Sequence, residues 1–188
     1  MNVHESWAVI HRFLGREFPS ITSTLVPGAA PSEIEALERT LMLKLPEDLK
    51  CSLMIHNGQL GESGLFDFRN LLGCSELLDQ FNMATEIYNE TGPAHPSERP
   101  ATDRITTDMG WGKGWVPFAG FQCSLVVADC LPPQEGHFGQ VFETDYQRPS
   151  EVLYESFSDW LAHYAKAFSE GKFEVRVGVP VVYGHQGA

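Results

Sequence analysis

Histidine is the residue type in this chain best suited to metal binding or acid–base chemistry, and the sequence holds seven of them. His4 and His11 stand seven residues apart in a predicted helix, which places both side chains on one face. A zinc site would need an H-E-x-x-H pattern or a third ligand at a matching spacing, and the sequence offers neither. We therefore interpret both histidines as surface or rim residues and expect no bound metal.

Motifs typical of a catalytic nucleophile or a phosphate-binding loop are also missing from the sequence. Residues 61–64, Gly-Glu-Ser-Gly, fall short of the G-x-S-x-G pattern. Cys51 and His56 are five residues apart, off a single helical face, so we do not expect them to form a Cys–His pair. The glycine-rich run 110–114 lacks the arrangement of a phosphate loop. The sequence thus predicts no enzymatic activity and no cofactor.

Acidic side chains dominate the charge of the chain. Thirteen Lys and Arg against 25 Asp and Glu give a formal net charge of −12. This balance argues against nucleic acid and against an anionic membrane surface, because both need a basic footprint. Residues 51–98 hold seven acidic side chains against Arg69 alone. Either a solvated helix surface or a docking face for a basic protein explains this stretch.

Acidic and aromatic side chains in predicted loops are the candidates for contacting a basic partner, because binding residues concentrate in loops. An exposed Trp111 near acidic side chains could anchor a partner rich in Lys and Arg. The alternative is that Trp111 folds back onto the core. The six predicted partner-binding residues are Glu62, Asp67, Asp103, Asp108, Trp111 and Glu135.

Targeting and cysteine patterns favour a cytoplasmic protein. The first residues, MNVHESWAVIHRFLG, carry charged side chains where a signal peptide needs an apolar run, and we expect no membrane-spanning segment. The four cysteines, Cys51, Cys74, Cys123 and Cys130, form no C-x-x-C pair. We expect them to be reduced thiols that fill core positions.

Helical periodicity appears in five stretches of the chain. Asn2 and Glu5 have the spacing of a capping box at the start of the first helix, and Ser32 and Glu35 have it at the start of the second. Glu38 in the second helix is expected to face water. Asn57-Gly58 is expected to end the third helix. The predicted helices cover 2–14, a stretch that opens at Ser32, 46–56, 76–90 and 156–169.

Strand patterns dominate the second half of the chain, and residues 19–31 are expected to form a loop. The order of helices, then strands, then a last helix is typical of an α+β fold. Pro180 cannot donate a ladder hydrogen bond, so the last strand should lie at an edge, where a second copy of the chain or a partner could pair with it. The predicted strands cover 115–119, 124–129, 140–142 and 173–183.

Five motifs, taken together and in order, resemble the SUKH superfamily. This superfamily includes fungal cell-wall-assembly regulators of the Smi/Knr type and bacterial immunity proteins. The segment Pro31–Gly58, PSEIEALERTLMLKLPEDLKCSLMIHNG, resembles its opening signature. The other motifs are WVPFAG at Trp115–Gly120, LVVADCLPP at Leu125–Pro133, GQVF at Gly139–Phe142 and VLYESFSDWLAHY at Val152–Tyr164.

The resemblance implies one α+β domain with a twisted, mostly antiparallel sheet flanked by helices. That domain would cover residues 31–170 with an insertion at 91–114. Residues 1–30 would form an N-terminal helix and linker, and residues 171–188 a C-terminal edge strand and tail. We expect Trp115, Pro117, Phe118 and Asp129 to be structural, because they set a strand and its turn.

The resemblance also implies a binding function without enzymatic activity. Our main hypothesis is a bacterial immunity protein, the antidote of a toxin–antitoxin pair, which blocks the active site of a cognate, basic secreted toxin. The alternative is an intracellular regulator or scaffold of the Smi/Knr type. An enzyme without a recognisable motif is a third hypothesis.

Overall fold

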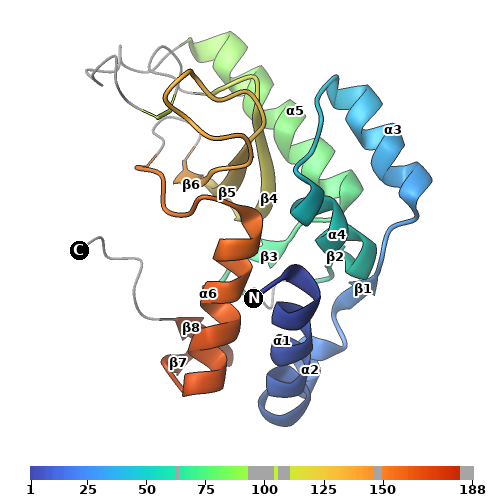
Figure 1. The fold of residues 1–188 in the computed structure, drawn as a ribbon, viewed down its shortest axis with the longest axis vertical. Helices are drawn as coiled ribbons and strands as arrows, with labels where there is room; N and C mark the ends of the chain where they lie inside the picture. The colour runs from blue at the N-terminus through green and yellow to red at the C-terminus, as the bar shows by residue number, and fades with distance from the viewer. Residues whose placement is uncertain (62–63, 93–103, 106–110, 146–149, 183–188) are drawn as a thin grey trace.

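A four-stranded antiparallel sheet runs through the part of the chain that the structure describes (Figure 1). The structure is a computed structural model and describes residues 1–61, 64–92, 104–105, 111–145 and 150–182. Three of the strands confirm the predicted runs in the second half of the chain. The strands, in spatial order, are β3 (Asn70–Leu71), β4 (Trp115–Phe121), β5 (Ser124–Asp129) and β6 (Val141–Thr144).

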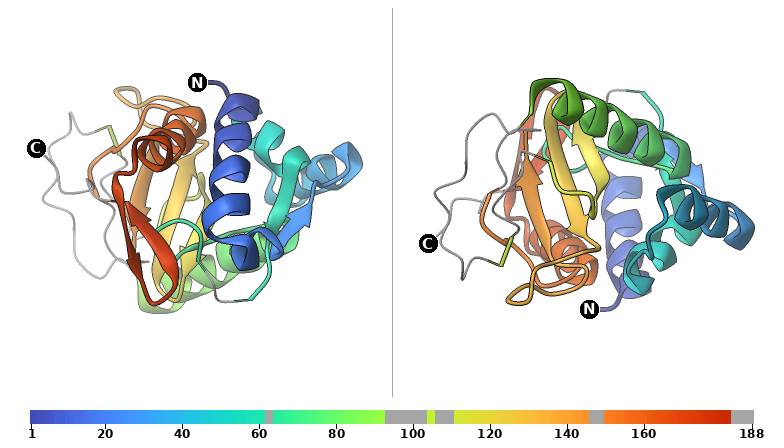
Figure 2. Two further views of the ribbon diagram at one scale, coloured as in Figure 1. Left: turned by 90° about the horizontal axis from the view of Figure 1, so that it is seen from below. Right: turned by 90° about the horizontal axis from the view of Figure 1, so that it is seen from above.

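Both faces of this sheet are apolar, and helices cover each of them. Side chains of residues 125–128 alternate between two hydrophobic clusters, as the two-residue period of a strand requires. Helix α5 (Cys74–Thr91) covers one face, and helix α6 (Phe157–Glu170) covers the other (Figure 2). The α+β fold class expected from the sequence is therefore confirmed.

Helix α1 (Val3–Glu17) begins with the predicted capping box. The Asn2 side chain accepts the backbone N–H of Glu5 at 2.9 Å, and the Glu5 carboxylate accepts the backbone N–H of Asn2 at 3.0 Å. The apolar side of the helix lies against α6, where the rings of Phe13 and Phe168 stack at 4.3 Å. Residues before position 31 thus share a core with the rest of the chain.

The predicted loop over residues 19–31 is wrong in part. A short helix, α2 (Pro19–Thr22), is followed by strand β1 (Leu25–Pro27). Strand β1 pairs antiparallel with β2 (His56–Gln59), a partner that lies about thirty residues further along the chain. A strand of three residues carries too little sequence pattern to be recognised without this partner.

The second and third predicted helices are α3 (Pro31–Leu41) and α4 (Glu47–Ile55). The predicted cap at Ser32 is wrong, because α3 begins at Pro31 and its cap is Ala30, two residues earlier. The Glu33 carboxylate, not that of Glu35, accepts the backbone N–H of Ala30 at 2.7 Å. Pro31 suits the first helical position, since it has no N–H that needs a partner there.

Glu38 is buried, although the sequence predicts that it faces water. Its carboxylate accepts the backbone N–H of Leu45 at 2.9 Å and lies 2.8 Å from Lys44 Nζ and 3.6 Å from Lys50 Nζ. Burial by itself raises the pKa of Glu38, but these hydrogen bonds and the lysine charges outweigh it and lower the pKa. Glu38 therefore connects the end of α3 to the start of α4.

Asn57 and Gly58 do not end helix α4, as predicted, but lie within strand β2. The Asn57 Oδ1 atom accepts the backbone N–H of Cys74 at 2.7 Å, which satisfies a free amide at the start of α5. Gly58 has a φ of 95°, and a Cβ atom there would lie 2.6 Å from the backbone nitrogen of Gly73. This close approach of β2 to α5 requires glycine.

The predicted single strand over 173–183 is instead a hairpin. Strands β7 (Phe173–Arg176) and β8 (Val179–Val182) pair antiparallel. Val177 and Gly178 form the two-residue turn, with φ values of 51° and 81°. Two positive φ angles in succession define the tight turn that joins twisted strands. Pairing of this hairpin with a second copy of the chain stays a prediction.

The turn at Val177 offers a test of this hairpin. Val177 is 97% exposed and β-branched, and the left-handed conformation strains such a residue, whereas Asn tolerates it. We expect Val177→Asn to raise the free energy of unfolding by about 1 kcal/mol, measured by urea denaturation. The control, Val175→Asn, changes an exposed residue in regular strand conformation and should give no gain. A less stable Val177→Asn protein would contradict the turn.

Candidate functional site

The six predicted partner-binding residues do not form one surface among the residues that the structure describes. Glu62, Asp103 and Asp108 lie outside the described residues. Trp111 is 2% exposed, so the expectation of an exposed tryptophan is wrong and the alternative, folding back onto the core, is confirmed. Its ring lies edge-on to Trp115 at 5.9 Å, in the cluster beneath α5.

Asp67 makes contacts within the molecule rather than presenting its carboxylate to a partner. The hydroxyl of Tyr164 in α6 donates to Asp67 Oδ2 at 2.6 Å, and the backbone N–H of Val182 in β8 donates to Oδ1 at 2.7 Å. Burial, followed by the charge of Asp67, raises the pKa of Tyr164 well above its ordinary value. Asp67 thus attaches the C-terminal hairpin to α6.

A polar network supports the loops that follow strand β5. Asp129 is fully buried, and its carboxylate accepts the backbone N–H of Leu131 and the side-chain N–H of Gln140, both at 3.1 Å. Burial raises the pKa of Asp129 to about 6, even though these two hydrogen bonds oppose the shift. The structural role expected for Asp129 is consistent with these contacts.

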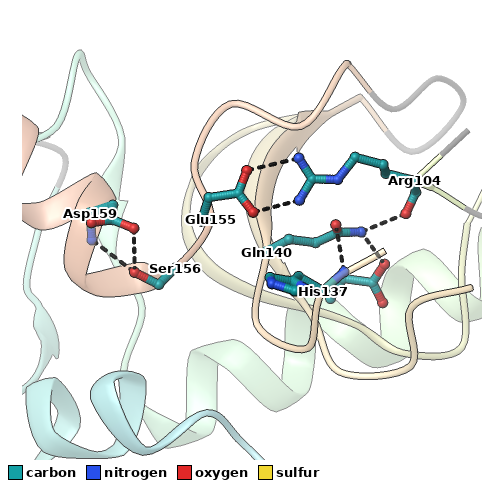
Figure 3. Close-up of polar contacts among 7 residues, drawn as sticks. Arg104, His137, Gln140, Glu155, Ser156 and Asp159 are labelled. Carbon is teal, nitrogen blue, oxygen red and sulfur yellow. Dashed lines mark hydrogen bonds and ion pairs between the residues drawn. The ribbon is translucent and has the colours of Figure 1, made fainter. Parts of the chain in front are cut away.

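The same network extends to the segment before α6 (Figure 3). Gln140 donates to the backbone carbonyl of Arg104 at 2.7 Å and accepts the backbone N–H of His137 at 3.0 Å. Arg104 then contacts both carboxylate oxygens of Glu155, at 2.8 and 2.6 Å. The loop that contains Glu135 is therefore held at one end, and Glu135 itself is exposed.

Exposed acidic side chains follow one side of helix α5. Glu76, Asp79, Glu86 and Glu90 recur at intervals of three, seven and four residues, which places them along one face. Met83 lies within this row and is 39% exposed. The helix contains no Lys or Arg, so nothing on α5 neutralises the row. We call these five residues the α5 stripe.

Two histidine side chains, those of His11 and His56, contact each other, which the sequence did not predict. His11 Nε2 lies 2.6 Å from His56 Nε2, and His56 Nδ1 lies 3.0 Å from the carbonyl oxygen of Val26. Since a carbonyl only accepts, His56 Nδ1 carries the proton, and in the neutral pair His11 Nε2 donates to His56 Nε2. This contact joins α1 to β2, so His11 and His4 do not act together.

His4 instead contacts Cys51, with 3.4 Å between Nδ1 and Sγ. A nucleophilic cysteine needs a lowered pKa, yet burial and the charge of Asp48 raise the pKa of Cys51. The contact is therefore structural. Within the described ranges, no three His, Cys, Asp or Glu side chains gather as a metal site would require. None of the described helices has the length and apolar character that crossing a membrane requires.

Comparison with known proteins identifies the family of this chain. Residues 28–163 match the model of the SMI1 / KNR4 family (SUKH-1). The chain belongs to this family. The match includes α3, α4, the four-stranded sheet and the first half of α6, and so confirms the resemblance to the SUKH superfamily.

Two of the three relatives of this SUKH-1 chain named here are called regulators. The chain is 28% identical over 189 residues to "Cell wall biosynthesis/cell cycle regulator smi1" of Schizosaccharomyces pombe, with 92% of this chain and 37% of the relative covered. It is 23% identical over 211 residues to "Glucan synthesis regulatory protein" of Neurospora crassa, with 92% and 40% covered. It is 21% identical over 192 residues to human "F-box only protein 3", with 92% and 36% covered. The chain thus spans 36% to 40% of the length of these relatives.

The contact between His11 and His56 predicts that the free energy of unfolding depends on pH. Burial lowers the pKa of both His11 and His56 below 6.5, and the charge of His56 contributes further at His11. The stability that the neutral pair contributes is therefore present above about pH 6.5 and is lost as the pH falls through the folded-state pKa values. We expect His56→Asn, which keeps a donor for Val26, to cost about 1 kcal/mol at about pH 7.5 and less at about pH 5.

Urea denaturation of wild type and His56→Asn at each pH measures this difference. Asp129 titrates in the same range with the opposite sign, because its folded-state pKa of about 6 lies above its ordinary value. Both proteins contain Asp129, so its contribution cancels in the difference between them. A difference that stays constant across the pH range would rule out the neutral imidazole pair.

Proposed function

We propose that this chain is a non-enzymatic regulatory domain that acts by binding a basic partner protein through the α5 stripe. The observation that carries the proposal is the row of four exposed carboxylates on a helix without a cation. Opposite charges on two surfaces accelerate their encounter and disfavour wrong partners. Met83 supplies an apolar contact at the centre of the row, where binding energy tends to concentrate.

Family membership supports a regulatory role over the immunity role that we predicted first. Two of the relatives are named as regulators of cell wall or glucan synthesis, and none of the three bears the name of a toxin antidote. We therefore favour regulation of the Smi/Knr type, and the bacterial immunity role stays a prediction. The neighbouring gene discriminates between them, since an antidote would be encoded beside its toxin.

Charge reversal on α5 tests the docking surface. We expect Asp79→Lys/Glu86→Lys to reduce partner capture by about tenfold at low ionic strength, because opposite-charge steering becomes repulsion. Wild-type binding should also weaken as salt is added, because salt screens exposed charges. The measurement is co-purification from the source cells with wild-type and variant chains, followed by calorimetric titration of each captured protein.

A matched variant controls for net charge. Glu135→Lys/Glu151→Lys makes the same change in charge at two exposed acidic residues outside α5. Capture that survives this change but not the α5 change supports the proposal. If only the control variant loses partner capture, the docking surface includes Glu135 and Glu151 rather than α5. If neither variant nor added salt changes partner capture, the proposed electrostatic binding is refuted.

A further inference from the structure

A surface groove lies beside the contact between helices α1 and α6, on the side of the sheet away from α5. It encloses a volume of about 340 Å³, which is enough for one or two side chains of a bound ligand. Both of its arginines are exposed, so the groove opens to solvent. The residues that line it are Val9, Arg12, Phe13, Arg16, Phe168 and Ser169.

The floor of the groove is apolar and closely packed. Phe13 and Phe168 stack at 4.3 Å with only 10° between their planes, and both are at least 95% buried. Phe173 lies edge-on to Phe13 at 4.9 Å and holds it from a third element. An apolar side chain that enters the groove would therefore meet a surface formed in advance, which lowers the entropy lost on binding.

The rim of the groove is positively charged in a chain of net charge −12. Arg12 and Arg16 are four residues apart, so their Cα atoms lie about 6 Å apart along α1 and both side chains leave the same side of the helix. Arg12 Nε contacts the Ala8 carbonyl at 3.4 Å, and Arg12 forms no ion pair with any residue that the structure describes. Arg16 uses Nε for its 2.6 Å contact with Glu17, an exposed pair of small energetic value.

The lining of the groove contains no carboxylate, and Glu17, which pairs with Arg16, lies outside this lining. Carboxylates are the natural complement of guanidinium groups, which bind them through paired hydrogen bonds. We propose that this groove binds an acidic peptide segment of a partner protein, with an aliphatic or aromatic side chain on the Phe13–Phe168 floor and flanking carboxylates on Arg12 and Arg16.

The site is separate from the α5 stripe and does not depend on the function proposed for it. Helices α5 and α6 cover opposite faces of the sheet, so the two surfaces can be occupied together (Figure 2). The groove residues also lie outside the stretch 28–163 that matches the family model. The chain could thus bridge a basic partner on one face and an acidic segment on the other.

Titration of isotope-labelled protein with synthetic peptides, followed by nuclear magnetic resonance, tests the proposal. The probe is Gly-Glu-Leu-Leu-Asp-Glu-Gly, added up to millimolar concentration. We expect shifts at residues 9–16 and 168–169 and at the Nε–H signals of the two arginines. Two control peptides replace either the three acids by Gln and Asn or the two leucines by Ser, and each should bind more weakly.

Arg12→Gln/Arg16→Gln should weaken binding of the probe about three- to tenfold, as expected for two exposed ion pairs. Arg39→Gln/Lys113→Gln removes the same charge at exposed positions outside the groove and should leave binding unchanged. Circular dichroism of each variant checks that α1 remains folded. Capture of the basic partner by α5 should be unaffected, which separates this site from the first.

Three outcomes would overturn the proposal. The first is the absence of shifts at the groove residues at millimolar probe. The second is binding that the arginine variant and its control weaken equally, since net charge alone would then explain it. The third is equal affinity for phenylacetate, which would assign the groove to a small carboxylate rather than to a peptide.

Discussion

The need to cover both faces of one sheet determines how this molecule is built. Strand β5 places apolar side chains alternately on its two faces, so neither face can remain in water. Helix α5 closes one side, and α6 together with α1 closes the other. Each helix packs its apolar side against the sheet, so its opposite side faces solvent and carries polar residues. The α5 stripe lies on such an outer side.

Two groups of acidic residues among those that the structure describes have different physical roles. Glu38, Asp67 and Asp129 are turned inward and accept hydrogen bonds from backbone and side-chain donors. They join elements that are distant in the sequence, and their burial would be costly without those donors. The residues of the α5 stripe have a different environment, because they remain exposed and contribute to the electrostatic field of the molecule.

The chain belongs to the SMI1 / KNR4 family, and its most distinctive features are two charged surfaces. Its Cys–His contact has a thiol with a raised pKa, and its histidine pair connects two elements of the fold. The acidic stripe on α5 and the arginine-rimmed groove on the opposite side are the two surfaces for which we propose protein partners.

Local pattern alone was enough to predict most elements, and the family was suggested by the resemblance of five motifs to the SUKH superfamily. The capping box of Asn2 and Glu5, the apolar period of α6 and the buried run of β5 are encoded by neighbouring residues. The hairpin after α6 was missed, because strict alternation of valines continued through its turn. None of the acids of α5 was among the six predicted partner-binding residues, although all of them lie in the acidic stretch 51–98. The inward turn of Asp67 and the burial of Trp111 were not evident from composition either. Those depended on contacts such as that with Tyr164, 97 residues away, and only the tertiary structure brings such residues together.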